Sequence, residues 1–179
     1  MNLVQIVHSD IDHNLLATEL LTLITEKNLQ DWEQFSLTSI SGEDEWDCSV
    51  GKMKDLKYPE RYYSVLNKSL RGTHIEQVLN RYPEYYRWRV MRLGGKTTYT
   101  VHSDSDGIHQ NIRLHIPVIS NPDAFLCFFD HRPESGRIVE AYYEHLELGN
   151  SYQVNTSGLH TAVNYNYTDR YHIVGVKYT

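Results

Sequence analysis

The sequence predicts a mainly β protein, in which helices come first and a β-sandwich or small barrel follows. Residues 13–27 repeat leucines at helical spacing, whereas short strand-like segments separated by turn residues dominate from about residue 85 onward. Fourteen Tyr and three Trp add aromatic rings that suit half-buried strands and pocket walls. Many short strands in succession are typical of sandwiches and barrels.

The chain length is that of one domain. At 179 residues the chain can bury one sizeable core, and it shows no internal repeat or linker. We therefore expect a single domain over residues 1–179, with a helical or mixed part at about 1–84 and a β core at about 85–178. The two cysteines, Cys48 and Cys127, lie far apart and form neither a metal-binding nor a redox spacing.

In the first part of the chain, only one helix has a clear sequence pattern. Residues 4–7 suit a short strand, and residues 13–27 an amphipathic helix whose leucine stripe faces the core. Residues 32–40 alternate as a strand does. Residues 60–72 and 74–81 favour further helices, the second ending before Pro83.

Strands are predicted throughout the second part. Residues 86–93 read as a strand, Gly94 to Lys96 as a tight turn, and residues 97–102 as the antiparallel partner of that strand. Further strands are predicted at residues 112–119, 124–129, 138–148, 151–155, 159–165 and 171–178.

Charge and patterning exclude several classes of function. The net charge of −6 predicts no general attraction to nucleic acid or to an anionic membrane. The first residues have no basic stretch followed by an apolar run, and no segment approaches the roughly 18 apolar residues of a membrane span. We therefore expect a soluble, cytoplasmic protein, and leave its oligomeric state open.

A metal-ligand pattern occurs at His102 and Asp104. Residues i and i+2 of an extended chain leave the same face, so an imidazole and a carboxylate at these positions can reach one cation. Asp106 competes for the carboxylate role, although its spacing from His102 fits less well. A second histidine from a distant strand, such as His160, completes the two-His, one-carboxylate set that suits non-haem Fe(II).

Arg170 follows His160 by ten positions and opens the next predicted strand. If the two strands are antiparallel neighbours, the two side chains lie near each other on one face. A guanidinium close to a metal suits a dicarboxylate cosubstrate, whose keto acid end binds the metal while the far carboxylate pairs with Arg.

Four features in order give the sequence its resemblance to a known family. They are His102-x-Asp104; Arg113-Leu-His115-Ile-Pro117 followed by Asn121-Pro122; the turn at Gly149; and His160 with Arg170 ten residues later. With them, residues 85–178 resemble the Fe(II)- and 2-oxoglutarate-dependent dioxygenases, specifically the aspartyl/asparaginyl β-hydroxylase branch that includes small proline hydroxylases.

The resemblance implies a fold, a reaction and a set of site residues. The expected fold is a double-stranded β-helix, also called a jelly roll or cupin-like fold, with the N-terminal helices packed on one sheet. The expected reaction consumes O2, decarboxylates 2-oxoglutarate to succinate and hydroxylates an amino acid or an amino-acid residue. The implied roles are Fe(II) ligands for His102, Asp104 and His160, cosubstrate binding for Arg170 and His115, and substrate binding for Arg113. No catalytic residue is implied beyond the metal ligands.

Other interpretations of these residues stay open. The histidines suit ordinary hydrogen-bonded positions in a β protein, Arg170 a surface pair with Asp169, and Arg113 a structural ion pair. At the level of the whole chain, the alternatives are another cupin-type metalloenzyme or a catalytically silent barrel that acts as a binding module.

Overall fold

The computed structural model describes residues 3–52, 55–104, 111–131 and 138–178. Its helical elements are α1 (His13–Glu26), the 3-10 turns η2 (Glu60–Tyr62) and η3 (Lys68–Leu70), and α2 (His74–Leu79). The strands are β1 (Val4–His8), β2 (Gln34–Ser36), β3 (Thr38–Ser39), β4 (Val65–Leu66), β5 (Tyr86–Leu93), β6 (Thr97–Thr98), β7 (Asn111–Ile119), β8 (Ala124–His131), β9 (Ile138–Glu144), β10 (Ser151–Asn155), β11 (Leu159–Asn164) and β12 (Arg170–Tyr178).

Two antiparallel sheets form the body of the protein. The six-stranded sheet has the order β1-β10-β7-β12-β5-β2, the four-stranded sheet the order β6-β11-β8-β9, and β3 pairs with β4 separately. From β5 onward the chain crosses repeatedly between the sheets: β5, β7, β10 and β12 belong to the large one, and β6, β8, β9 and β11 to the small one. This is the double-stranded β-helix, so the predicted fold class is confirmed.

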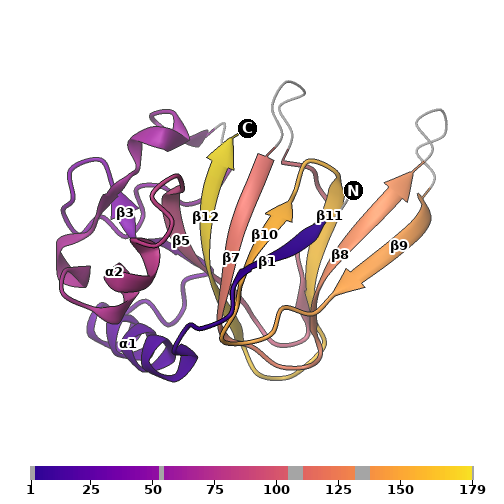
Figure 1. Ribbon diagram of the computed structural model, residues 1–179, viewed down its shortest axis with the longest axis horizontal. Coiled ribbons are helices and arrows are strands. Elements are labelled where there is room, and N and C mark those ends of the chain that lie inside the picture. Colours follow the sequence, from indigo (N-terminus) through magenta and orange to yellow (C-terminus); the bar gives the residue numbers. More distant parts are fainter. Residues whose placement is uncertain (1–2, 53–54, 105–110, 132–137, 179) are drawn as a thin grey trace.

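Strand β7 shows why the large sheet is buried on both faces. Its apolar residues Ile112, Leu114 and Ile116 join the core cluster that contains the buried residues of α1 and α2. The alternating residues Arg113 and His115 face the space between the sheets, because side chains along a strand point to opposite faces. Helices α1 and α2 lie together on one side of the large sheet, and β8 and β9 lie on the other (Figure 1).

Helix α1 confirms the strongest prediction for the first part of the chain. Asp12 caps it by accepting a hydrogen bond from the backbone N–H of Leu15 at 3.0 Å. Its leucine stripe is buried, with Leu16 and Leu20 both 0% exposed, and faces the core as predicted. Among the described residues, no helix combines the length and the apolar character needed to cross a bilayer.

The predicted hairpin of residues 86–102 is wrong. Strand β6 does not pair with β5 but crosses to the small sheet, where Thr98 lies opposite Val163 of β11. Gly95 allows the chain to pass close to the Tyr167 backbone at this crossing, since a Cβ on Gly95 would lie 2.3 Å from the Tyr167 carbonyl oxygen. A local turn pattern cannot distinguish a hairpin from such a crossing.

Two predictions for the first part also differ from the structure. Residues 60–72 form no continuous helix, because η2 and η3 flank the short strand β4, which pairs with β3. The strand predicted at 32–40 is divided into β2 and β3. In both places tertiary pairing overrides local propensity.

Gly175 of β12 fits a position where a side chain has no room. A Cβ there would lie 2.7–2.8 Å from three carbons of the buried Trp88 ring. We expect Gly175→Ala to lower the free energy of unfolding by roughly 1–3 kcal/mol through overpacking. The matched control is Gly158→Ala, where nothing lies within 4 Å, and its expected effect is within about 0.5 kcal/mol. Equal losses for both variants in urea unfolding would contradict this interpretation of Gly175.

His115 and His172 form a buried histidine pair on β7 and β12, with their Nδ1 atoms 3.5 Å apart. Burial, assisted by the nearby Arg170 and Arg113, lowers the pKa of His115 to about 3 from an ordinary value of 6.5. Burial also lowers the pKa of His172 well below its ordinary value. Both rings are therefore neutral in the folded protein at neutral pH.

This pair predicts a loss of stability in mild acid. Below pH 6.5 the unfolded chain binds a proton on His115, whereas the folded chain does so only near pH 3. The free energy of unfolding should then fall by roughly 1.4 kcal/mol per pH unit from this residue alone. In urea unfolding at pH 7 and pH 5, His115→Gln should show a smaller fall than the wild type; an equal fall would contradict the assignment.

Candidate functional site

A cavity of about 890 Å³ opens between the two sheets. The large sheet contributes Arg89, Arg113, His115 and Arg170 to its wall, and the small sheet contributes Leu126 and His160. The segment 99–104, which follows β6, supplies His102 and Asp104. Every residue assigned a role from the sequence therefore lines this one cavity.

Paired backbone hydrogen bonds hold the two histidine-bearing segments together. The N–H of His102 donates to the carbonyl of His160 at 3.0 Å, and the N–H of His160 donates back at 2.8 Å. A further hydrogen bond, from the Asp104 N–H to the Thr156 carbonyl at 3.0 Å, fixes the next turn of the segment. The two segments are thus locked side by side, although they lie far apart in the sequence.

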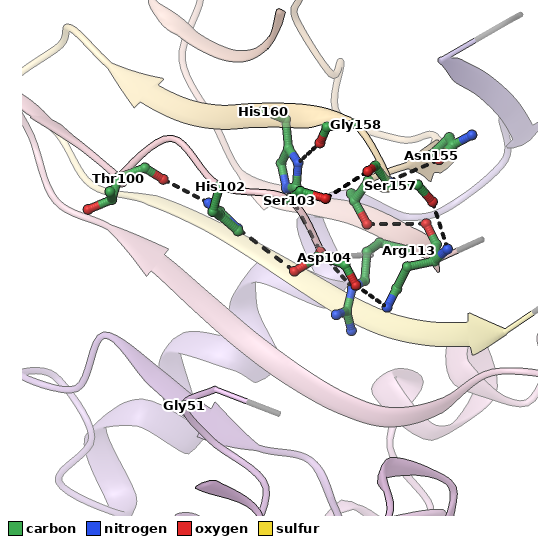
Figure 2. Close-up of polar contacts among 12 residues, drawn as sticks. Gly51, Thr100, His102, Ser103, Asp104, Arg113, Asn155, Ser157, Gly158 and His160 are labelled. Atoms are coloured by element: carbon green, nitrogen blue, oxygen red, sulfur yellow. Dashed lines mark hydrogen bonds and ion pairs between the residues drawn. The ribbon is translucent and has the colours of Figure 1, made fainter. Parts of the chain in front are cut away.

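His102, Asp104 and His160 point their polar atoms toward one another (Figure 2). Their possible ligand atoms all lie within 4.8 Å of one another. Nε2 of His102 is 3.9 Å from Oδ1 of Asp104, and Nε2 of His160 is 3.8 Å from Oδ2. The side chain of His102 is 47% exposed and that of His160 is 9% exposed, so the cluster spans from the cavity mouth to its interior.

Both rings are oriented by the same local contact. Nδ1 of His102 lies 2.7 Å from the Thr100 carbonyl, and Nδ1 of His160 lies 3.0 Å from the Gly158 carbonyl. Since a carbonyl only accepts, each Nδ1 carries the proton and each Nε2 presents a lone pair to the cluster. Burial lowers the pKa of His160, which favours the neutral ring. This is the usual arrangement of a metal-binding histidine.

Asp104 is ionised at neutral pH. Burial by itself raises the pKa of its carboxyl, but Arg113, His160 and hydrogen bonds outweigh burial and hold the pKa at about 2. Asp106, the competing carboxylate in the sequence, lies outside the described residues, as does His109.

Arg113 forms a structural ion pair, which was one of the two roles considered for it; the other was substrate binding. Its Nε donates to Asp104 at 3.2 Å, and its Nη1 lies 3.6 Å from Glu60 of η2. Glu60 also accepts from Arg87, whose Nε donates to the carbonyl of Ser49 at 2.9 Å. A buried chain of charges therefore links the N-terminal part to Asp104. The substrate role of Arg113 stays a prediction.

Arg170 lies in the cavity wall, 3% exposed. The surface pair with Asp169 is wrong, because Asp169 binds Arg92 at 2.7 Å. Within the described part of the chain no carboxylate lies within 4.0 Å of Arg170, and its Nε has no hydrogen-bond partner. Burial lowers the pKa of this guanidinium to about 10, so it stays charged at neutral pH.

His160 and Arg170 line the same cavity, but the predicted reason, that their strands are antiparallel neighbours, is wrong. Strand β11 pairs with β6 and β8, whereas β12 pairs with β5 and β7, so the two strands are not neighbours in a sheet. The two side chains reach the same cavity from opposite sheets.

Arg89 and Gln34 also line the cavity, and sequence reasoning gave them no role. A signal was present in β5, where Arg87 and Arg89 alternate with the buried apolar residues Trp88 and Val90. Charged residues on one face of a buried strand indicate a polar cavity. His172, which sequence reasoning also gave no role, is buried beside His115.

No protein-family model matches the chain, and no curated protein matches it. Among solved structures, a Burkholderia pseudomallei oxidoreductase of the 2OG-Fe(II) oxygenase family is 12% identical, with 99% of this chain and 84% of that chain covered and a TM-score of 0.55. The non-heme alpha ketoglutarate dependent epimerase SnoN from nogalamycin biosynthesis is 11% identical (99% and 77% covered, TM-score 0.55). A Pseudomonas putida prolyl-4-hydroxylase is 8% identical (97% and 91% covered, TM-score 0.53).

The match to the carbocyclase SnoK spans about half of each protein, 52% of this chain and 48% of that chain, at 13% identity and a TM-score of 0.40. At such identities, the longer matches with higher TM-scores establish that this chain shares the fold of those oxygenases.

Proposed function

We propose that this protein is an Fe(II)- and 2-oxoglutarate-dependent dioxygenase that hydroxylates an amino acid or an amino-acid residue. The observation that carries the proposal is the cluster of His102, Asp104 and His160, with both Nε2 atoms turned toward one carboxylate. Arg170, a buried guanidinium without a carboxylate partner in the described residues, lines the same cavity and supports the cosubstrate assignment.

The donor set fits Fe(II). Two neutral imidazoles and one ionised carboxylate are the set that binds this ion while leaving coordination positions open. Nε2 and carboxylate oxygen atoms that lie 3.8–3.9 Å apart leave room for one ion between them, at the roughly 2.0–2.2 Å metal–ligand distances of such sites. The Thr100 and Gly158 carbonyls keep both rings in the required tautomer.

The cavity also fits 2-oxoglutarate. Arg170 offers a bidentate fork to the distal carboxylate, which in turn offsets the cost of burying the guanidinium. His115 lies on the same wall and stays neutral, so it offers a hydrogen bond without adding charge.

When bound, Fe(II), O2 and 2-oxoglutarate supply the oxidising chemistry, with 2-oxoglutarate converted to succinate and CO2. His102, Asp104, His160 and Arg170 would hold these groups in one cavity, and its remaining wall would orient the substrate C–H toward them. The resemblance to the aspartyl/asparaginyl β-hydroxylase branch, with its proline hydroxylases, supports amino-acid hydroxylation as the outcome. We propose Arg113 for the substrate side of the cavity.

Removing a proposed ligand should remove metal binding. We expect the wild type to bind one equivalent of Co(II), a spectroscopic substitute for Fe(II), and Asp104→Ala or His160→Ala to weaken binding by more than roughly 100-fold, since loss of a ligand exceeds the loss typical of an outer contact. His145→Ala is the control, because His145 contacts the Ala124 carbonyl and does not line the cavity. Visible absorption titration measures the effect, and wild-type affinity in His160→Ala rules out the site.

Removing the Arg170 guanidinium should weaken binding of the cosubstrate. Titration of 2-oxoglutarate into Zn(II)-loaded protein should show at least roughly 30-fold weaker binding to Arg170→Gln, the effect of deleting one partner of a buried charge pair. Arg92→Gln is the matched control, because Arg92 pairs with Asp169 and does not line the cavity. Unchanged affinity in Arg170→Gln would exclude its assigned role.

A further inference from the structure

Arg89 is a second buried guanidinium in the cavity wall. It is 5% exposed, and its Nη1 donates to the Oε1 of Gln34 at 3.0 Å. Its Nε has no hydrogen-bond partner, and no carboxylate of the described ranges lies within 4.0 Å of it. Burying a guanidinium without an anionic partner destabilises the folded protein, unless a bound anion pairs with the guanidinium.

The neighbouring arginines each have a carboxylate partner within the protein. Arg87 binds Glu60, Arg113 binds Asp104 and lies near Glu60, and Arg92 binds Asp169 outside the cavity. Arg89 and Arg170 have no carboxylate within 4.0 Å among the described residues. Burial lowers the pKa of Arg89 and the nearby charges of Arg87 and Arg113 lower it further, whereas the more distant carboxylates of Glu60 and Asp104 raise it without reversing the shift. Because an arginine keeps its proton in proteins, this pressure favours an anion beside it.

Arg89 and Arg170 lie at separate positions along the large sheet. On the strand pair β5–β12, Arg89 is opposite Val174, whereas Arg170 is opposite Leu93. Four residues of extended chain place the two backbones about 14 Å apart along the strands. One dicarboxylate bound to the metal and Arg170 therefore leaves Arg89 for a second ligand.

We propose that Arg89 binds a carboxylate of the primary substrate, which is thus a small carboxylic acid such as an amino acid with a free carboxylate. The inference rests on the proposed function, since it assigns the remaining anion site of the same cavity. Gln34 accepts from Arg89 and, at 3.4 Å, from the Gly51 N–H through its amide oxygen, so its amide nitrogen is a second donor to the carboxylate. A fork and one amide match a planar carboxylate.

A purely structural role explains Arg89 less well. The backbones of β2 and β5 already pair, with Gln34 opposite Met91 and Ser36 opposite Arg89. The contact from Arg89 to Gln34 adds one hydrogen bond to this junction, which does not offset the burial of a charged group.

The test uses protein loaded with Zn(II) and 2-oxoglutarate, which cannot turn over. The twenty proteinogenic L-amino acids and their C-terminal amides are screened by thermal shift, and binders are titrated by calorimetry. At least one acid should bind while its amide does not. Arg89→Gln should weaken binding of that acid by at least roughly 30-fold and leave binding of 2-oxoglutarate nearly unchanged. Arg92→Gln should alter binding of neither ligand.

Gln34→Glu supplies a second variant that does not depend on tolerance of an arginine deletion. The new carboxylate pairs with Arg89 inside the protein. It should therefore raise the thermal stability of the ligand-free protein and weaken binding of the same acid. A structural role alone predicts the stabilisation without the loss of binding.

The outcomes separate the two proposals. If the wild type fails to bind 2-oxoglutarate, the oxygenase assignment fails. If 2-oxoglutarate binds but no acid does, or an acid and its amide bind equally, or Arg89→Gln keeps its affinity for the acid, the assignment of Arg89 is overturned and the oxygenase assignment stands.

Discussion

The two backbone hydrogen bonds that His102 and His160 exchange are the contact on which the candidate site depends. They join the segment after β6 to the start of β11, and so bring two histidines and Asp104 together in one cavity. Each ring then donates its Nδ1 proton to a carbonyl two residues earlier in its own segment. The orientation of the lone pairs is therefore a consequence of backbone pairing, and it needs no bound ion to establish it.

The large sheet can carry the basic residues of the cavity wall because one of its faces packs on the helices and the other lines the cavity. Its outer face holds the apolar residues that pack on α1 and α2, and that core stabilises the sheet. The inner face is then free to carry Arg89, Arg113, His115 and Arg170. Burial of so many basic groups opposes folding. The N-terminal part offsets some of this cost, since η2 supplies Glu60 and β2 supplies Gln34.

The sequence was a good guide wherever one residue pattern determines the outcome. The leucine stripe predicted α1, and most strands after residue 85 follow alternation and turn chemistry. The residues of the proposed triad were selected from the spacing of His102 and Asp104 and from the family resemblance, and the structure brings them together. Local patterns do not state which sheet a strand joins, so both predicted hairpins, 86–102 and the one carrying His160 and Arg170, were wrong. Glu60 and Arg89 escaped notice because their importance arises from partners distant in the sequence.

The pairing of Arg113 bears on how the site accommodates a metal. In the structure this guanidinium stabilises the charge of Asp104, the carboxylate proposed as a ligand. A divalent cation bound at the cluster would stabilise the charge of Asp104 in its place and would repel Arg113. Glu60 lies 3.6 Å from Nη1 of Arg113, so the guanidinium retains an anionic neighbour when its contact with Asp104 weakens. The charge of Arg113 would therefore stay balanced if a metal bound at the cluster. Glu60 is distant in sequence from the proposed ligands, and its contact with Arg113 explains why this acidic side chain is buried here.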